Sequence, residues 1–310
     1  METQEEELIV PPHLAGRRLD WILAQLLPQY SRAQLRQWID AGGVHLADRM
    51  ARGSARLEAG ARLRLDASCW PQRTVGLVTP EALPLQVVHE DRWLAVLDKP
   101  PGLVVHPGAG NGRGTLQHGL VHRWPHLAAL PRAGLIHRLD KDTSGLLVVA
   151  LEETVALQLT AALAQRRITR RYVAWVAGQL AGSGVVDAPI ARHPVHRTRM
   201  AVVPRGRPAR THYRAAAHYR EATRLDIQLD TGRTHQIRVH MAHIGHPVMG
   251  DPVYGSKRSS CALRRQALHA CTLGLRHPVT GEDMLWHSPL PVDLADWAAR
   301  LSCPDDLAAS

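Results

Sequence analysis

The stretch GLIHRLDKDTSGLL, residues 134–147, carries five ionisable side chains between aliphatic flanks. These are His137, Arg138, Asp140, Lys141 and Asp142. Ionisable side chains beside a hydrophobic core usually have a partner or a chemical task. Aspartates next to a glycine also favour turns. The stretch therefore predicts a strand that ends at Leu139, a turn that presents charged groups, and a second strand from Gly145 onward.

From Leu85 onward, short β-rich runs are separated by turns and a few helices. The runs are LQVVHE (85–90), WLAVLD (93–98), GLLVVAL (145–151), RRYVAWVAG (170–178) and TRLDIQLD (223–230). The many apolar residues of 153–166 predict a helix. Because strands and helices do not alternate regularly, the sequence predicts an α+β fold rather than a doubly wound sheet.

The N-terminal part reads as a separate small domain of two helices followed by a small sheet. The apolar residues of its first helix have the spacing of one helical face. These are Leu19, Ile22, Leu23, Leu26 and Leu27. A segment with three prolines and little periodicity then predicts a linker. We expect a first domain over 1–67 with its core at 17–66, a linker over 68–84, a larger domain over 85–303 and a tail over 304–310.

Positive charge predicts a polyanionic partner. The net charge is +10, and nine arginines lie between Arg17 and Arg64 against four acidic residues. Arg32 and Arg36 lie one helical turn apart, so they share a face. We expect this face to follow nucleic-acid phosphates. An anionic membrane is the weaker alternative, because the sequence has no strongly amphipathic basic helix.

The composition is that of an ordinary globular protein, with 45% hydrophobic and 21% charged residues. The first residues, METQEEELIV, lack the basic start and apolar stretch of a secretion signal. The four cysteines lie far apart, which argues against a disulfide framework or a zinc site. The sequence predicts a cytoplasmic protein without membrane attachment.

Two motifs suggest metal chemistry, and both have simpler interpretations. His240, His243 and His246 are spaced three apart, but Gly245 and Pro247 interrupt a helix there, which favours core or RNA-facing histidines. The order D-x-D-T in LDKDTSG approaches that of Mg²⁺-dependent aspartyl phosphotransferases, which remain a weak alternative. We expect no cofactor and no metal.

The stretch TGRTHQIRVHMAH, residues 231–243, places Arg233 and Arg238 beside apolar residues. A guanidinium near a core requires a carboxylate partner. An aspartate paired in this way keeps its negative charge and can act as a nucleophile. Asp140 is the candidate partner.

Four ordered motifs resemble the RluA family of pseudouridine synthases. They are KPPGLVVHPGAGN (99–111), HRLDKDTSG (137–145), RRYVAWVAG (170–178) and TGRTHQIRVHMAHIGHPVMGDPVYG (231–255). The first domain resembles the S4 RNA-binding domain. Within the family the chain is most similar to the RluD type, which modifies uridines in helix 69 of 23S ribosomal RNA. The resemblance implies a catalytic domain with a mixed, largely antiparallel sheet.

The resemblance also implies roles for individual residues. Asp140 matches the catalytic aspartate, which attacks the uridine or its ribose, and Arg238 matches the arginine that pairs with it. Tyr172 matches the tyrosine that stacks on the flipped base. Arg138 matches a residue that enters the RNA stack. Arg233 and His137 are further candidates for RNA contacts.

The implied partner is 23S ribosomal RNA or a precursor of the large ribosomal subunit. Flipping a base out of a stem-loop costs a few kcal/mol of unstacking. We expect a monomer with no obligate protein partner. A non-catalytic, S4-type ribosome-assembly factor that only binds RNA is the alternative from a different class.

Overall fold

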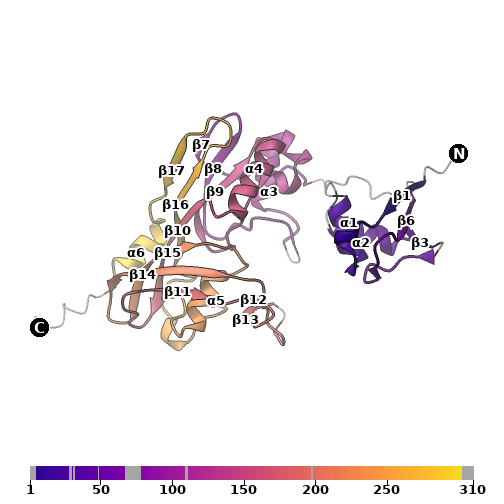
Figure 1. Cartoon of the computed structure of the whole chain (residues 1–310). Coiled ribbons are helices and arrows are strands. Elements are labelled where there is room, and N and C mark those ends of the chain that lie inside the picture. Colours follow the sequence, from indigo (N-terminus) through magenta and orange to yellow (C-terminus); the bar gives the residue numbers. More distant parts are fainter. Residues whose placement is uncertain are drawn as a thin grey trace, which may run out of the picture. The chain divides into compact units, whose positions relative to one another are not determined.

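The computed structural model describes residues 5–27, 30, 32–47, 49–66, 78–108, 111–196 and 198–301. The chain divides into two compact units, residues 1–77 and 78–310 (Figure 1). Most of the predicted linker, residues 68–77, and the predicted tail, residues 304–310, lie outside the described residues.

The first unit contains both predicted helices and a small antiparallel sheet. The helices are α1 (Leu19–Leu26) and α2 (Arg32–Asp40). The sheet has the order β1 (Glu5–Ile9), β6 (Arg62–Asp66), β3 (Val44–Leu46), β4 (Arg49–Met50), and β2 (Arg17–Arg18) pairs separately with β5 (Arg56–Leu57). Apolar side chains of α1, α2 and the sheet form one buried cluster around Trp38 and Leu63. The predicted helical face of α1 is therefore the core-facing one.

The second unit is built on a mixed sheet. Its strands follow the order β11 (Ser183–Asp187), β14 (Arg210–His218), β15 (Ala222–Leu229), β10 (Thr169–Ala177), β16 (Leu268–Arg276), β9 (Ser144–Ala150), β8 (Leu94–Lys99), β7 (Gln86–Glu90), and β17 (Asp283–His287) also pairs with β16. The pair β16–β9 is parallel, and the other described pairs of this sheet are antiparallel. A small hairpin of β12 (Ile190–Arg192) and β13 (Met200–Val202) lies apart from it. The predicted α+β class and largely antiparallel sheet are confirmed.

The five predicted β-runs are strands β7, β8, β9, β10 and β15, and the predicted helix is α4 (Glu153–Ala164). The strands β11, β14, β16 and β17 were not predicted. Strand β14, RTHYRAAAH, has no large aliphatic residues at its partly buried positions. The sequence therefore shows little of the two-residue hydrophobic period that predicts a strand.

Helices cover both faces of the central strands. In β9 every residue is buried. Leu146 and Val148 pack with α4 on one face, and Leu147 and Val149 belong to the larger core on the other. That larger core includes side chains of α3 (Leu116–Arg123), α5 (Gln236–His243) and α6 (Val292–Ala298). This double burial explains why GLLVVAL reads as a continuous apolar run.

The sheet divides where β9 meets β16. These strands pair in parallel at Ser144 with His269 and at Gly145 with Ala270, and farther along β16 pairs with β17 instead. Gly145 has a φ of 112°, and a Cβ there would lie 2.2 Å from the carbonyl oxygen of Ala270. Only glycine fits this close approach. The HRLDKDT segment therefore enters the sheet at its dividing point.

Gly145→Ala is expected to lower the free energy of unfolding by about 3 kcal/mol, since it adds a steric clash to an unfavourable φ. Urea denaturation would measure the loss. Gly112→Ala is the matched control, because a Cβ at Gly112 meets nothing within 4 Å. Equal stabilities of the two variants would contradict this account of the junction.

Candidate active site

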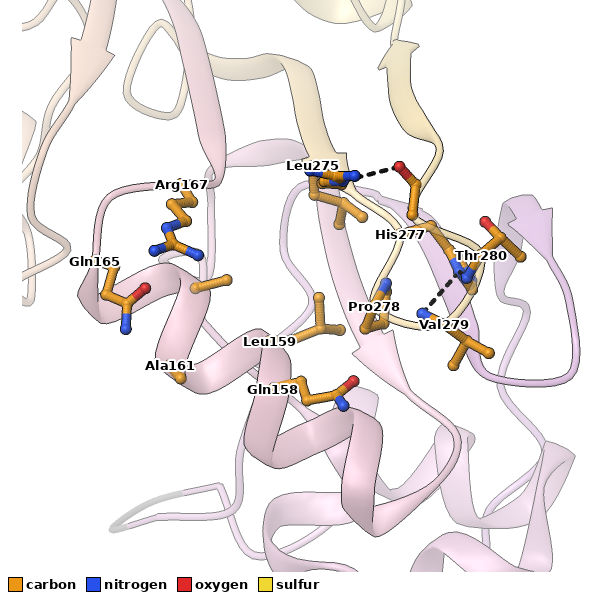
Figure 2. A pocket seen from close by; sticks show the side chains of 13 residues that line it. Gln158, Leu159, Ala161, Gln165, Arg167, Leu275, His277, Pro278, Val279 and Thr280 are labelled. Carbon is orange, nitrogen blue, oxygen red and sulfur yellow. Dashed lines mark hydrogen bonds between the residues drawn. The ribbon is translucent and has the colours of Figure 1, made fainter.

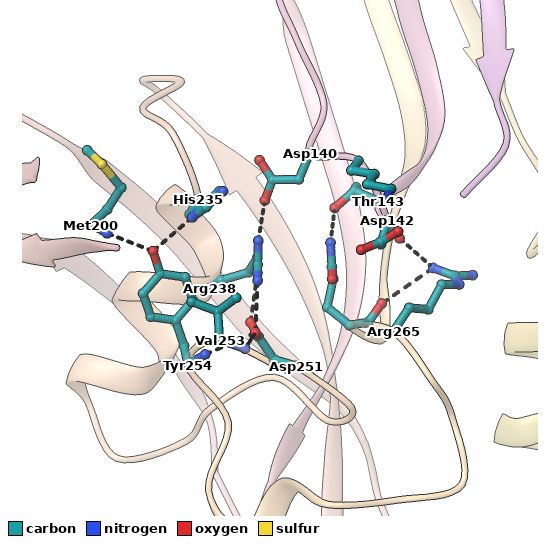
Figure 3. A network of polar contacts seen from close by, with 12 residues as sticks. Asp140, Asp142, Thr143, Met200, His235, Arg238, Asp251, Val253, Tyr254 and Arg265 are labelled. Carbon is teal, nitrogen blue, oxygen red and sulfur yellow. Dashed lines mark hydrogen bonds and ion pairs between the residues drawn. The ribbon is translucent and has the colours of Figure 1, made fainter. Parts of the chain in front are cut away.

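Arg238 on α5 joins two aspartates in a buried network (Figure 3). Its Nε and Nη2 donate to the two carboxylate oxygens of Asp251 at 2.7 and 2.8 Å, and its Nη1 donates to Asp140 at 3.0 Å. The Asp251 side chain is fully buried and that of Arg238 is 5% exposed, whereas Asp140 is 15% exposed. Asp140 is thus the member of the network that solvent can reach.

The electrostatics of the network keep its buried members charged. Burial alone would lower the pKa of Arg238, but the hydrogen bonds to Asp251 and the charge of Asp140 raise it. Burial alone would raise the pKa of Asp251, but Arg238 and the backbone N–H groups of Tyr254 and Val253 lower it. The predicted pairing of Arg238 with Asp140 is present, and Asp251 is its unpredicted third member.

A buried lysine holds the turn that carries Asp140. Lys99, at the end of β8, donates from Nζ to the carbonyl oxygens of Pro100, Leu103 and Lys141 at 2.7, 3.0 and 2.9 Å. Burial lowers the pKa of Lys99 to about 7, against the opposing effect of Asp142 and Asp140. Lys99 therefore connects the C-terminal end of β8 to the turn that carries Asp140.

The turn itself is closed by backbone and side-chain bonds. The N–H of Thr143 donates to the carbonyl oxygen of Asp140 at 3.1 Å. Gln266 donates to the Thr143 hydroxyl at 3.1 Å. Arg265 donates to the carbonyl oxygen of Asp142 at 3.2 Å. Thr143 thus has a structural role in the turn.

Tyr172 lies on β10 and is 6% exposed, in the same apolar cluster as Leu139. Burial raises the pKa of its hydroxyl, Arg170 opposes that rise, and Asp140 adds to it. The phenol is therefore protonated at neutral pH and lies within the electrostatic influence of Asp140. This position suits a ring that packs against an apolar surface; stacking on a base stays a prediction.

A second polar group flanks Asp140. His235 precedes α5 in a left-handed conformation, with a φ of 57°. Its Nδ1 is 2.8 Å from the Tyr254 hydroxyl, which also accepts a bond from the N–H of Met200 at 2.9 Å. Figure 3 shows these residues on the same side of Arg238. Burial lowers the pKa of His235, and the charge of Asp140 opposes this effect.

The predicted RNA-contact residues of the HRLD segment differ in their surroundings. Arg138 is exposed, and its charge reaches His106 and His235. His137 accepts a hydrogen bond from the N–H of Val148 at 3.3 Å, and burial lowers its pKa to about 3. A neutral ring bonded to β9 braces the segment. An RNA contact of His137 stays a prediction. Because the ring is neutral, such a contact would not include an attraction between a positively charged histidine and a phosphate.

Arg233 and Arg36 have described partners that are not members of the Arg238 network. Arg233 donates from Nε to the carbonyl oxygen of Pro208 at 3.0 Å. In the first unit, Arg36 is exposed on α2, 3.9 Å from Asp40. Arg32 belongs to the same helix, but its side chain lies outside the described residues.

Two histidines of HMAHIGHP, His240 and His246, have structural partners. His240 is fully buried and lies within hydrogen-bond distance of the Thr211 hydroxyl and the Ala188 carbonyl oxygen. His246 is 2.9 Å from the carbonyl oxygen of Ala177. Within the described ranges, no three His, Cys, Asp or Glu side chains form a cluster suited to a metal ion. The interpretation as core histidines fits His240.

A cavity of about 460 Å³ lies between α4 and the turn after β16 (Figure 2). Leu159 and Leu275 line it together with Arg167 and His277. It contains no member of the Arg238 network. The candidate site is therefore defined by the ion pairs and not by this cavity.

Sequence reasoning missed Asp251, Lys99 and Tyr254. Each stood in a quoted motif, GDPVYG or KPPG, without an assigned role. The usable signal for Lys99 was a lysine that ends the apolar run WLAVLD. Asp251 offered a weaker signal, because its partner Arg238 lies thirteen residues earlier, across a helix end and a loop.

Two family models match this chain, one in each unit. A family model described as RNA pseudouridylate synthase matches residues 93–243, and an S4 domain model matches residues 17–63. The human RNA Pseudouridylate Synthase Domain Containing 1 superimposes with a TM-score of 0.56 at 27% identity, over 74% of this chain and 95% of that one.

Close relatives cover nearly the whole chain. A protein of Nitrosomonas europaea named Ribosomal large subunit pseudouridine synthase D is 51% identical over 93% of this chain and 86% of its own length. The protein of that name from Escherichia coli K12 is 45% identical over 91% of this chain and 89% of its own. The chain belongs to the RNA pseudouridylate synthase family and is an RNA pseudouridine synthase with an N-terminal S4 domain.

Asp251→Asn is expected to destabilise the fold by about 3–5 kcal/mol, because it weakens a buried ion pair and leaves a guanidinium poorly compensated. Thermal or urea denaturation would measure the effect. Asp226→Asn is the control. Asp226 pairs with Arg214 at the surface, and such pairs contribute about 1 kcal/mol or less. A loss no larger than that of the control would contradict the buried role of Asp251.

Lys99→Met should change how stability depends on pH. The folded protein releases the Lys99 proton near pH 7, whereas the unfolded chain holds it up to about 10.5. Between these values the unfolded state binds more protons, so the wild type gains stability relative to the variant by up to about 1.4 kcal/mol per pH unit.

Urea denaturation of both proteins at about pH 7, 8 and 9 would measure this difference. The exposed Lys141 supplies the control variant Lys141→Met, for which we expect no such trend. Parallel pH profiles of wild type and Lys99→Met would disprove the titration of Lys99 in this range.

Proposed function

We propose that this enzyme converts uridine to pseudouridine in 23S ribosomal RNA of the large subunit, in the helix 69 stem-loop, with Asp140 as the nucleophile. The observation that carries the proposal is the ion pair between the buried Arg238 and the partly exposed Asp140. The names of the relatives at 45–51% identity support ribosomal RNA as the substrate. The similarity of the motifs to the RluD type supports helix 69.

The reaction is an isomerisation, so uridine and its product have the same atomic composition. The bond between C1′ of the ribose and N1 of uracil breaks, and a bond between C1′ and C5 forms. The hydrogen of C5 is lost to water or a base, and N1 gains one. No electrons enter or leave overall, so the change requires a nucleophile, proton transfer and control of the free base.

The residues of the site match these requirements. Arg238 pairs with the carboxylate of Asp140 and orients it, so that it attacks the uridine or its ribose. The ring of Tyr172 packs against the flipped base, and Arg138 occupies the space that the base leaves in the RNA. Arg233, His137, Arg32 and Arg36 contribute further RNA contacts.

The proposed ribosomal substrate and the separate S4 domain suggest where the enzyme acts and with which partners. We propose that the enzyme acts as a cytoplasmic monomer on 23S RNA or a subunit precursor, without an obligate protein partner. No described helix is long and apolar enough to span a membrane. The S4 domain supplies a basic surface for phosphates, outside the catalytic unit.

Asp140→Asn is expected to abolish product formation and to leave RNA binding intact. Tritium at C5 of the uridines in a large-subunit RNA fragment gives a direct readout, since product formation releases it. We expect a loss of rate of at least about 10³-fold, because no other group replaces the nucleophile. Asp142→Asn, in the same turn, is the control and should retain activity.

Tritium release by Asp140→Asn at the wild-type rate would eliminate Asp140 as the nucleophile. An active wild type with modification outside helix 69, located by chemical mapping, would keep the reaction and reject the target. Binding without release by the wild type would favour the assembly-factor alternative.

A further inference from the structure

The turn that carries Asp140 is supported from behind by a residue outside the Arg238 network. Arg265 directly precedes the segment that leads into β16, and its side chain is 7% exposed. Its Nη1 donates to the carbonyl oxygen of Asp142 at 3.2 Å and is also near the carbonyl oxygens of Gln266 and Leu268. One guanidinium therefore connects the turn to the start of β16.

The rest of this guanidinium is fixed by α6. Nε and Nη2 of Arg265 donate to the two carboxylate oxygens of Asp293 at 2.6 and 2.9 Å. These bonds lower the pKa of Asp293. A bidentate pair fixes the plane of the guanidinium, and with it the direction of Nη1. Figure 3 shows Arg265 beside Asp142, across the turn from Arg238.

Asp293 is the solvent-exposed partner of this ion pair, which distinguishes a positioning role for the pair from a mainly stabilising one. The Asp293 side chain is 44% exposed, and a cavity of about 760 Å³ beside it is lined by Arg264, Asp296 and Trp297 as well as the pair itself. Ion pairs that reach solvent contribute little to stability. The bond from Nη1, in contrast, reaches the turn itself, at the carbonyl oxygen of Asp142, two residues from Asp140.

We infer that Arg265 and Asp293 are positioning residues for the nucleophile. Arg238 is held rigidly by Asp251, so the distance between Arg238 and Asp140 depends on where the turn places Asp140. Arg265 fixes that placement from the opposite side. The inference rests on the proposed role of Asp140. It assigns to α6 a catalytic contribution without substrate contact.

Arg265→Gln is expected to lower kcat about 10- to 100-fold, since small misplacements of reacting groups have effects of this size, and to leave KM for the RNA within about 2-fold. Asp293→Asn should lower kcat less, about 3- to 10-fold, because Arg265 remains but loses its fixed plane. Arg265→Lys should recover part of the loss of Arg265→Gln, because one donor can still reach the turn. Steady-state tritium release gives both constants.

Two control variants separate positioning from charge. Arg264→Gln removes the same charge from the same cavity wall and should affect KM at most. Asp296→Asn removes a carboxylate from α6 and should leave both constants unchanged. If Arg265→Gln retains the wild-type kcat, or if Arg264→Gln lowers kcat equally, the inference is wrong.

A readout independent of activity tests the same geometry. The N–H of Thr143 donates to the carbonyl oxygen of Asp140, so hydrogen exchange at Thr143 reports closure of the turn. In Asp293→Asn this exchange should be about 10-fold faster, with an unchanged melting temperature. Unchanged exchange would overturn the inference. If the wild type is inactive but exchange at Thr143 is still faster in Asp293→Asn, the proposed function is wrong, whereas the support of the turn by α6 stands.

Discussion

A single buried guanidinium organises the site, because two aspartates depend on it in different ways. Asp251 is fully buried and also accepts bonds from the N–H groups of Val253 and Tyr254. Its bonds fix the plane of Arg238 and leave Nη1 for Asp140. The shared cation thus bonds to one aspartate that is fully buried and to a second one that solvent can reach.

The fold supplies this arrangement at the point where its sheet divides. The parallel pairing of β9 with β16 is short, and the adjacent turn lies between the C-terminal end of β8 and the segment before β16. Lys99 and Arg265 approach the turn from these two elements. Arg238 reaches Asp140 from α5. Asp140 is thus placed by contacts from three separate parts of the chain.

The sequence predicted the parts of the site that lie in local motifs. Asp140 and its turn followed from charged residues between apolar runs, and the need of Arg238 for a carboxylate followed from its apolar neighbours. The supports were not predictable in the same way. Arg265 contacts Asp142, which lies 123 residues away in the sequence, and Lys99 contacts Lys141, which lies 42 residues away. Periodicity within a short stretch cannot predict contacts between residues so far apart. The same limit explains β14, whose small and charged residues depend on neighbouring strands for their conformation.

The long separations along the chain have a consequence for synthesis. The bond from Arg238 to Asp140 spans 98 residues, and those from Gln266 to Thr143 and from His269 to Ser144 span 123 and 125. Contacts of this range form slowly and late, because a long loop must close before they stabilise the fold. A nascent chain that has emerged only as far as α5 contains Asp140 but lacks Arg265, Gln266 and β16, which hold its turn. The complete arrangement around Asp140 therefore forms only after β16 has left the ribosome.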